Sequence, residues 1–286
     1  MKREYSRIGV IGAGTIGIGV AEAIAAAGVP VTVVDLSSRE LEYARERLDG
    51  SLRAGRLLSG GDGGEALDLI RGLIRFSTSY EDLSGAGIIV ENITERIADK
   101  QALYEQLGRV CEVSCILAAN TSAIPIAHLA SLVDRPDRVV GVHFMNPVPR
   151  KTTVEVIRGK LTSAPTVEAI LAFLERIGKQ GIVVEDAPGF VSNRVLMLAI
   201  NEAVGVVDDG VAPAASVDRI FRECFGHAMG PLETADLIGL DTILDTLEVL
   251  LHFTREEKFR PSDLLRRMVA DGQRGRKTGR GFYDYE

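Results

Sequence analysis

The sequence predicts an α/β protein in two parts, an N-terminal doubly wound, mostly parallel sheet followed by an all-α C-terminal domain. Two observations carry this prediction. Short apolar runs of strand length alternate with helical stretches over the first two thirds of the 286 residues, which is typical of βαβ units. After "EDAPGF" the strand-like runs stop and only helical patterns follow. We therefore predict one domain over residues 1–185 and a second over residues 186–286.

The predicted strands are apolar runs that are too short to be helices. They cover residues 8–11, 31–34, 88–90, 116–119, 139–142, 154–157 and 182–184. The helical stretches between them cover residues 16–27, 39–58, 100–109 and 167–177. The glycine-rich segment "GGDGGE", residues 60–65, is expected to be a turn between two helices. In the second domain, "VSNRVLMLAINEAVGVV" is apolar nearly all round, which indicates a buried helix.

Composition excludes several classes of protein. The net charge of −7 and the pI of about 5.3 argue against nucleic acid as a partner, because phosphate binding needs a basic surface. Residues 8–34 are apolar, but six glycines, Glu22 and a proline predict a buried strand, turn and helix instead of a membrane span. The cysteines are Cys111, Cys115 and Cys224, an odd number without a zinc-type pair, so we expect free thiols, no metal and a cytoplasmic protein.

The segment "GAGTIG" follows the first predicted strand and opens the first predicted helix. Gly12 would allow the tight turn, Gly14 the approach of a pyrophosphate, and Gly17 close packing of the helix, as in a Rossmann dinucleotide site. Asp35 follows the second strand and would bind the ribose 2′-hydroxyl, so its charge favours NAD over NADP; Arg39 is near enough to keep NADP as an alternative. The candidate contacts in the turn are Gly12, Gly14, Thr15, Ile16 and Gly17.

Polar side chains follow three further strands. "ENITER" supplies Glu91 and Glu95, "NTS" supplies Asn120 and Ser122, and His143 follows the strand after that. Taken singly, a histidine is more often structural, and Asn-Thr-Ser is typical of a helix cap. In a parallel sheet, however, the carboxyl ends of these strands meet at one edge together with the glycine turn. Their coincidence predicts a ligand site at that edge.

Glu155 lies inside the apolar run "TTVEVI". A carboxylate in a strand interior needs a partner or solvent, and His143 is a plausible partner across the intervening turn. A carboxylate bonded to one ring nitrogen would fix the tautomer and orient the ring. The other nitrogen could then take a proton from a substrate hydroxyl. We therefore predict that His143 and Glu155 form a catalytic pair.

Asn193 is an amide on an otherwise apolar stripe of the long helix in the second domain. It shares that stripe with Phe190, Met197, Ile200 and Val204. Such an amide either bonds to backbone in the core or lines a ligand cleft. The sequence leaves both alternatives open.

Several longer motifs follow one another from about residue 7 to residue 285. They are "GAGTIG", "ENITER" followed by Lys100, "NTSAIPI", "GVHFMNPVP" with "VEVIRG", "APGFVSNR", "GPLETADLIGLD" and the closing "GRKTGRGFYDY". Together they resemble the L-3-hydroxyacyl-CoA dehydrogenase family over nearly the whole chain. The resemblance implies a Rossmann domain followed by a helical domain that forms a homodimer. It also implies oxidation of a 3-hydroxyacyl thioester with NAD, or the reverse reduction.

The same resemblance implies roles for individual residues. By position, His143 matches the catalytic base and Glu155 the carboxylate that orients it. Ser122 matches a serine that hydrogen-bonds the substrate, and Asn193 an asparagine near the reacting carbonyl. The further positions expected to bind the cofactor are Glu95, Lys100 and Asn120.

The chain departs from the family after "NPVP", where Met-Lys-Leu usually precedes "VEV". Here the sequence is Arg150-Lys151-Thr152-Thr153. The threonines favour a small polar acyl group, as in relatives that act on a glyceryl unit held by an acyl carrier protein. Arg150 and Lys151 could contact the phosphopantetheine phosphate or an acidic carrier protein, or they could form a solvated turn.

The sequence therefore favours an NAD-dependent 3-hydroxyacyl-thioester dehydrogenase, with a carrier-protein substrate preferred slightly over acyl-CoA. A short-chain enzyme such as 3-hydroxybutyryl-CoA dehydrogenase is the first alternative. A dehydrogenase of free β-hydroxyacids is disfavoured, because such enzymes use a lysine on the long helix, where this chain has Asn193 and Arg194. A non-catalytic NAD-binding or structural protein is the remaining alternative.

Overall fold

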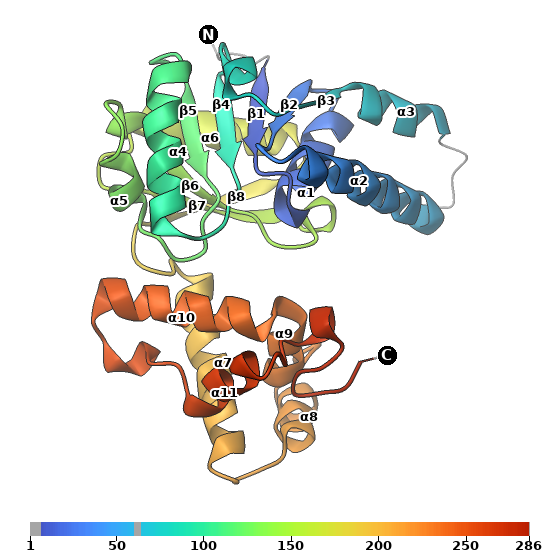
Figure 1. Cartoon of the computed structure of the whole chain (residues 1–286), viewed down its shortest axis with the longest axis vertical. Helices are drawn as coiled ribbons and strands as arrows, with labels where there is room; N and C mark the ends of the chain where they lie inside the picture. Colours follow the sequence, from blue (N-terminus) through green and yellow to red (C-terminus); the bar gives the residue numbers. More distant parts are fainter. Residues whose placement is uncertain (1–6, 60–63, 286) are drawn as a thin grey trace. The chain divides into compact units, whose positions relative to one another are not determined.

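The computed structural model describes residues 7–59 and 64–285, and the chain divides into two compact units, Met1–Ala187 and Pro188–Glu286 (Figure 1). The first unit includes Asp186, whose carboxylate accepts hydrogen bonds from the backbone N–H groups of Ile126 (2.9 Å) and Ala127 (2.7 Å). The predicted boundary, between residues 185 and 186, is close to this division.

The first unit is built on one eight-stranded sheet with the order β3-β2-β1-β4-β5-β6-β7-β8. The strands are β1 (Ile8–Ile11), β2 (Val31–Val34), β3 (Ile74–Ser77), β4 (Ile88–Glu91), β5 (Ile116–Ala119), β6 (Val139–His143), β7 (Thr153–Arg158) and β8 (Gln180–Glu185). Strands β1 to β6 are parallel, β7 is antiparallel to β6, and β8 is parallel to β7. The strand order reverses direction between β1 and β4, which is where open α/β sheets bind ligands. This confirms the predicted doubly wound, mostly parallel sheet.

Helices cover both faces of the sheet (Figure 1). They are α1 (Thr15–Ala26), α2 (Ser38–Ser59), α3 (Gly64–Gly72), α4 (Ile97–Val110), α5 (Ile126–Ala130) and α6 (Ala164–Arg176), with the 3₁₀ turns η1 (Tyr80–Leu83), η2 (Pro136–Arg138) and η3 (Val148–Arg150). The main core cluster joins α1 and α6 to one face of the strands, and α4 and α5 lie over the other face. Buried on both faces, the central strands are continuous apolar runs, which explains why the sequence revealed them.

Strand β3 was not predicted from the sequence. It lies at the edge of the sheet, and of its four residues only Ile74 is buried. An edge strand needs fewer apolar residues, so "IRFS" lacks the signal that marks the other strands. The predicted turn at residues 60–65 falls largely outside the described residues.

The second unit is helical, as predicted. It contains α7 (Ser192–Asp208), α8 (Ala214–Phe225), α9 (Pro231–Ile238), α10 (Leu240–Thr254), η4 (Glu257–Phe259), α11 (Asp263–Ala270) and η5 (Arg276–Thr278). Among the residues that the structure describes in both units, no helix is both long enough and apolar enough to cross a membrane.

Two buried aspartates join the closing "GRGFYDY" segment to the helices of this unit. Asp218 accepts hydrogen bonds from two N–H groups at the start of α9 and from the Tyr283 hydroxyl (2.6 Å). Asp236 accepts from the N–H of Tyr283 (3.0 Å) and the hydroxyl of Tyr285 (2.9 Å). Burial beside Asp236 raises the pKa of Tyr285 to about 12. Gly281 is required here, because a Cβ atom would lie 2.0 Å from the Asp236 carboxylate.

Candidate active site

The glycine turn after β1 leaves an open space in front of α1. Gly12 has a φ of +89°, and a Cβ on it would lie 2.7 Å from the carbonyl oxygen of Asn92. A Cβ on Gly17 would lie 1.9 Å from the carbonyl oxygen of Gly12, so the helix packs directly on the turn. At Gly14, by contrast, a Cβ would meet nothing within 4 Å. Helix α1 has neither a capping side chain nor an acidic residue in its first turn. Its positive end is therefore suited to a pyrophosphate, and these residues fit a dinucleotide.

Asp35 follows β2 and is tied to the glycine turn. Its Oδ2 accepts a hydrogen bond from the N–H of Ala13 (3.0 Å), and its Oδ1 accepts from the N–H of Ser37 (3.0 Å). Arg39, which could have accommodated a 2′-phosphate, donates instead to the Tyr43 hydroxyl (2.8 Å). A carboxylate at this position favours NAD, because its charge would repel a 2′-phosphate.

His143, Glu155 and Ser122 lie in a line of hydrogen bonds. His143 ends β6 and pairs in register with Glu155 on antiparallel β7, so two residues 12 positions apart come face to face. His143 Nδ1 is 2.8 Å from Glu155 Oε2, and His143 Nε2 is 3.3 Å from Ser122 Oγ. Both members of the His–Glu pair are largely buried. The predicted pairing of Glu155 with His143 is thus present in the structure.

The loop that carries Ser122 is held by Glu95. Glu95 Oε1 accepts hydrogen bonds from the N–H groups of Ser122 (2.9 Å), Ala123 (3.0 Å) and Ile124 (3.3 Å), and from the hydroxyl of Thr121. One carboxylate oxygen therefore accepts hydrogen bonds from the donors of a whole turn. Glu95, predicted to bind the cofactor, is in this structure an anchor of the serine loop.

Asn120 joins three segments of the sheet edge. Its Nδ2 donates to Asn92 Oδ1 (2.9 Å), and its Oδ1 accepts from the N–H of Phe144 (3.1 Å), directly after His143. Asn92 in turn donates to the carbonyl of Val90 (3.0 Å). These amides lock the ends of β4, β5 and β6 together, and the sequence had not indicated a role for Asn92.

Lys100 and Glu91 form a buried ion pair behind this edge. The Lys100 ammonium lies 2.7 and 2.8 Å from the two Glu91 carboxylate oxygens, and the two side chains are 0% and 1% exposed. Burial raises the pKa of Glu91, and the charge of Lys100 opposes that shift. The sequence had placed Glu91 at this edge without giving it a catalytic or cofactor-binding role.

The segment Arg150-Lys151-Thr152-Thr153 lies on the surface, with all four residues exposed. A buried lysine, Lys179, holds it from beneath by donating to the carbonyls of Val148 (2.7 Å) and Lys151 (2.8 Å). Burial lowers the pKa of Lys179.

Asn193 belongs to the helical unit. It is the second residue of α7 and is buried, as are Met197, Ile200 and Val204 on the same stripe. Phe190, expected on this stripe, is buried but lies before the first residue of the helix and has a positive φ. Its role at the reacting carbonyl stays a prediction.

The three cysteines are free thiols, and within residues 7–59 and 64–285 no group of histidine, cysteine and acidic side chains is arranged to hold a metal ion.

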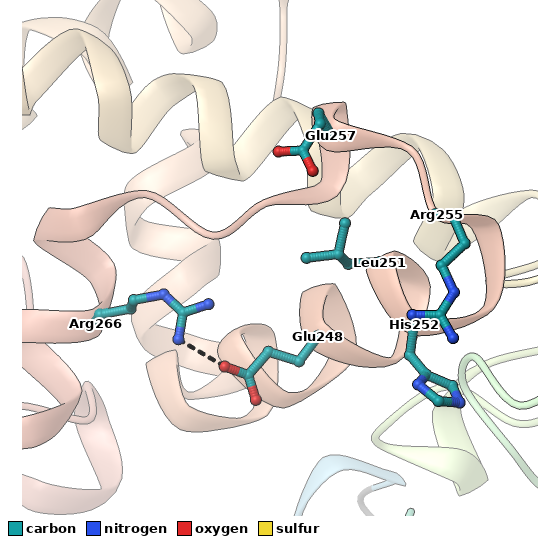
Figure 2. A pocket seen from close by; sticks show the side chains of 6 residues that line it. All are labelled: Glu248, Leu251, His252, Arg255, Glu257 and Arg266. Carbon is teal, nitrogen blue, oxygen red and sulfur yellow. Dashed lines mark hydrogen bonds and ion pairs between the residues drawn. The ribbon is translucent and has the colours of Figure 1, made fainter.

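The helical unit also carries a surface pocket of its own (Figure 2). The residues that line it are Glu248, Leu251, His252, Arg255, Glu257 and Arg266. Arg266 and Glu248 point toward each other and form a 2.7 Å ion pair, and Glu257 pairs with Arg260 (2.6 Å). These balanced charges favour neither an anion nor a cation as a ligand, and the pocket contains none of the predicted site residues.

Comparison with known families shows to which family the chain belongs. The model of the "3-hydroxyacyl-CoA dehydrogenase, NAD binding domain" matches residues 7–187, and that of the "3-hydroxyacyl-CoA dehydrogenase, C-terminal domain" matches residues 189–285. The chain belongs to the 3-hydroxyacyl-CoA dehydrogenase family. Its resemblance to that family is thereby confirmed, and so are its NAD cofactor and its class as an NAD-dependent oxidoreductase.

Individual members of the 3-hydroxyacyl-CoA dehydrogenase family match along their full length. A probable 3-hydroxybutyryl-CoA dehydrogenase of Bacillus subtilis is 43% identical over 99% of this chain and 98% of its own. The 3-hydroxybutyryl-CoA dehydrogenase of Bradyrhizobium diazoefficiens is 39% identical over 100% of this chain and 97% of its own. The crystal structure of (S)-3-hydroxybutyryl-CoA dehydrogenase from Ralstonia eutropha superposes with a TM-score of 0.92 at 39% identity, covering 99% of this chain and 100% of that one.

Replacement of Gly14 by alanine tests the cofactor site. Because the added methyl meets no protein atom, the variant should fold normally and lose NAD affinity at least about tenfold, or about 1.4 kcal/mol, by obstructing the pyrophosphate. The measurements are the thermal midpoint and the NAD dissociation constant from calorimetry. Gly108→Ala on α4 is the matched control, since its Cβ also meets nothing within 4 Å. Unchanged NAD affinity in Gly14→Ala would mean that the pyrophosphate does not approach this turn.

Proposed function

We propose that the protein interconverts a short-chain 3-hydroxyacyl-CoA and its 3-keto form, with 3-hydroxybutyryl-CoA as the first substrate to test. The observation that carries the proposal is the hydrogen-bonded line of Ser122, His143 and Glu155 at the edge of an NAD-binding sheet. The names of the full-length relatives point to the same acyl group.

In the oxidation, His143 acts as the general base. Glu155 holds the ring through Nδ1, which leaves Nε2 to take the proton of the 3-hydroxyl. The negative charge of Glu155 stabilises the imidazolium that results, as the carboxylate of a catalytic triad does. Bound NAD supplies the acceptor for the hydride that leaves C3 with its electron pair as the carbonyl forms. In the reverse direction, protonated His143 returns the proton to the carbonyl oxygen.

Ser122 and Asn193 are proposed to orient the substrate oxygen. Ser122 Oγ lies on the Nε2 side of the His143 ring, so a substrate oxygen bound to Nε2 also comes within its reach. Asn193 has two amide donors suited to a carbonyl oxygen. Its assignment rests on the family resemblance.

We therefore favour an acyl-CoA as the substrate over an acyl group held by a carrier protein. None of the three relatives described above carries a name that refers to a carrier protein. Exposed Arg150 and Lys151 remain suited to a phosphate, and coenzyme A supplies phosphates as well as a carrier's prosthetic group does.

We also propose that the helical unit mediates a homodimer. Its surface exposes large apolar side chains to water. Val195 on α7 is 65% exposed, and Ile220 and Phe225 on α8 are 49% and 67% exposed. Exposed apolar side chains can mark a protein–protein interface.

A substrate panel tests the proposed reaction. We expect NADH-dependent reduction of acetoacetyl-CoA and NAD-dependent oxidation of 3-hydroxybutyryl-CoA, each followed by NADH absorbance. Glyceryl-loaded acyl carrier protein serves as the competing substrate. If the enzyme turned over the loaded carrier protein but neither CoA ester, the proposal would be contradicted and the carrier-protein substrate would be favoured again.

Substitution of the His–Glu pair tests the mechanism. His143→Ala should lower kcat roughly 10²–10⁴-fold, the usual contribution of a general base, while NAD affinity stays within about twofold. Glu155→Gln should lower kcat by a similar order, because the ring tautomer is no longer fixed. His252→Ala, a surface histidine of the helical unit, is the control and should retain kcat. Near-normal turnover of His143→Ala would exclude it as the base.

Two charges on α8 test the homodimer. Light scattering of the unmodified protein should give twice the 30.8 kDa chain mass, and Ile220→Asp with Phe225→Asp should give one chain mass. Arg219→Ala on the same helix removes only an exposed ion pair with Glu223 and should leave the dimer intact. A single-chain mass for the unmodified protein would refute the proposal.

A further inference from the structure

A chain of charges runs from the interior of the sheet to the loop that carries Ser122. It begins at Glu91, the last residue of β4, which lies in register with Ile11 on one side and Ala119 on the other. Lys100, in the first turns of α4, reaches both Glu91 oxygens at 2.7 and 2.8 Å. Because neither side chain has appreciable exposed surface, this pair cannot itself contact a cofactor or a substrate in the geometry observed.

Glu95 connects that pair to the loop. Its Oε2 lies 3.7 Å from the Lys100 ammonium, while its Oε1 accepts the N–H groups of Ser122, Ala123 and Ile124. The Glu95 side chain is 25% exposed, so without an attractive charge behind it the carboxylate could turn toward solvent. Lys100 also lies 3.5 Å from the carbonyl oxygen of Asn120, two residues before Ser122. Two contacts therefore link one buried cation to the serine loop.

Glu95 is the acceptor that three successive backbone N–H groups of the serine loop share. If Glu95 turned away, three backbone N–H groups would lose their shared acceptor, and the loop would relax to satisfy them elsewhere. Ser122 Oγ, now 3.3 Å from His143 Nε2, would move with its backbone. A displacement of about 1 Å at a reacting centre can cost about a hundredfold in rate.

We propose that Glu91 and Lys100 are positioning residues for Ser122, acting through the carboxylate of Glu95. This inference rests on the proposed dehydrogenase reaction and adds a role for Glu91, whose side-chain hydrogen bonds described here go to Ile93 and Lys100. Glu91 keeps Lys100 in place, Lys100 keeps Glu95 turned inward, and Glu95 orders the loop.

A double-mutant cycle provides the test. At saturating NAD, Glu91→Gln should lower kcat for 3-hydroxybutyryl-CoA about 10- to 100-fold. In a Ser122→Ala background the same substitution should change kcat less than about twofold, because the group that it positions is already gone. The NAD dissociation constant should stay within about twofold in both backgrounds.

Glu22→Gln is the matched control, since Glu22 is a buried carboxylate on α1 that is remote in sequence from the serine loop and makes no contact with it among the hydrogen bonds described. It should leave kcat within about twofold. If Glu91→Gln lowered kcat by the same factor with and without Ser122, the proposal would be overturned. Such independence is expected of a general structural role, which does not act through Ser122. A loss confined to NAD affinity, with kcat intact, would equally overturn it and assign the pair to the cofactor.

A second variant covers the case in which Glu91→Gln fails to fold with an unbalanced buried ammonium. The combination Glu91→Gln with Lys100→Met removes both charges and should fold, yet it leaves Glu95 without its cation. It should show the same kcat loss and the same dependence on Ser122. Full kcat in this neutral variant would overturn the proposal. Absence of activity in the unmodified protein, by contrast, would refute the dehydrogenase function and not the positioning role alone.

Discussion

The antiparallel pairing of β7 with β6 is the constraint on which the reacting groups depend. The parallel strands β1 to β6 all end at one edge of the sheet, and a neighbour running the other way begins at that edge. Glu155, near the start of β7, therefore lies opposite His143, at the end of β6. A backbone ladder on both sides holds the two strands, so the 2.8 Å contact of the side chains is set by the sheet instead of by a mobile loop.

Two of the acids at this edge are hydrogen-bonded to backbone donors. Glu95 accepts from the serine loop, and Asp35 accepts from the glycine turn. The start of α1 is different, because no side chain caps it. An anionic cofactor thus meets an uncapped helix end, while the neighbouring acids are already engaged and repel it less.

Much of the fold was predictable because the central strands are buried on both faces and therefore occur in the sequence as continuous apolar runs. The glycine turn and Asp35 were predictable as well, since their spacing follows from the βαβ unit itself. The edge strand Ile74–Ser77 was not, because one solvated face removes the apolar signal. Family resemblance supplied candidate roles for Ser122 and Asn193 that periodicity alone could not.

By itself, the sequence determined the order of the elements, the dinucleotide turn and the set of polar residues that end the strands. The tertiary structure alone decided which of those residues touch. Glu91 and Lys100 are nine positions apart, and nothing in the sequence paired them with each other, yet the fold buries both and makes them partners. Glu95 likewise became the anchor of a loop that lies more than twenty residues further along the chain. The reason is that local patterns encode burial and periodicity, whereas the partner of a buried charge depends on which segments the sheet brings side by side.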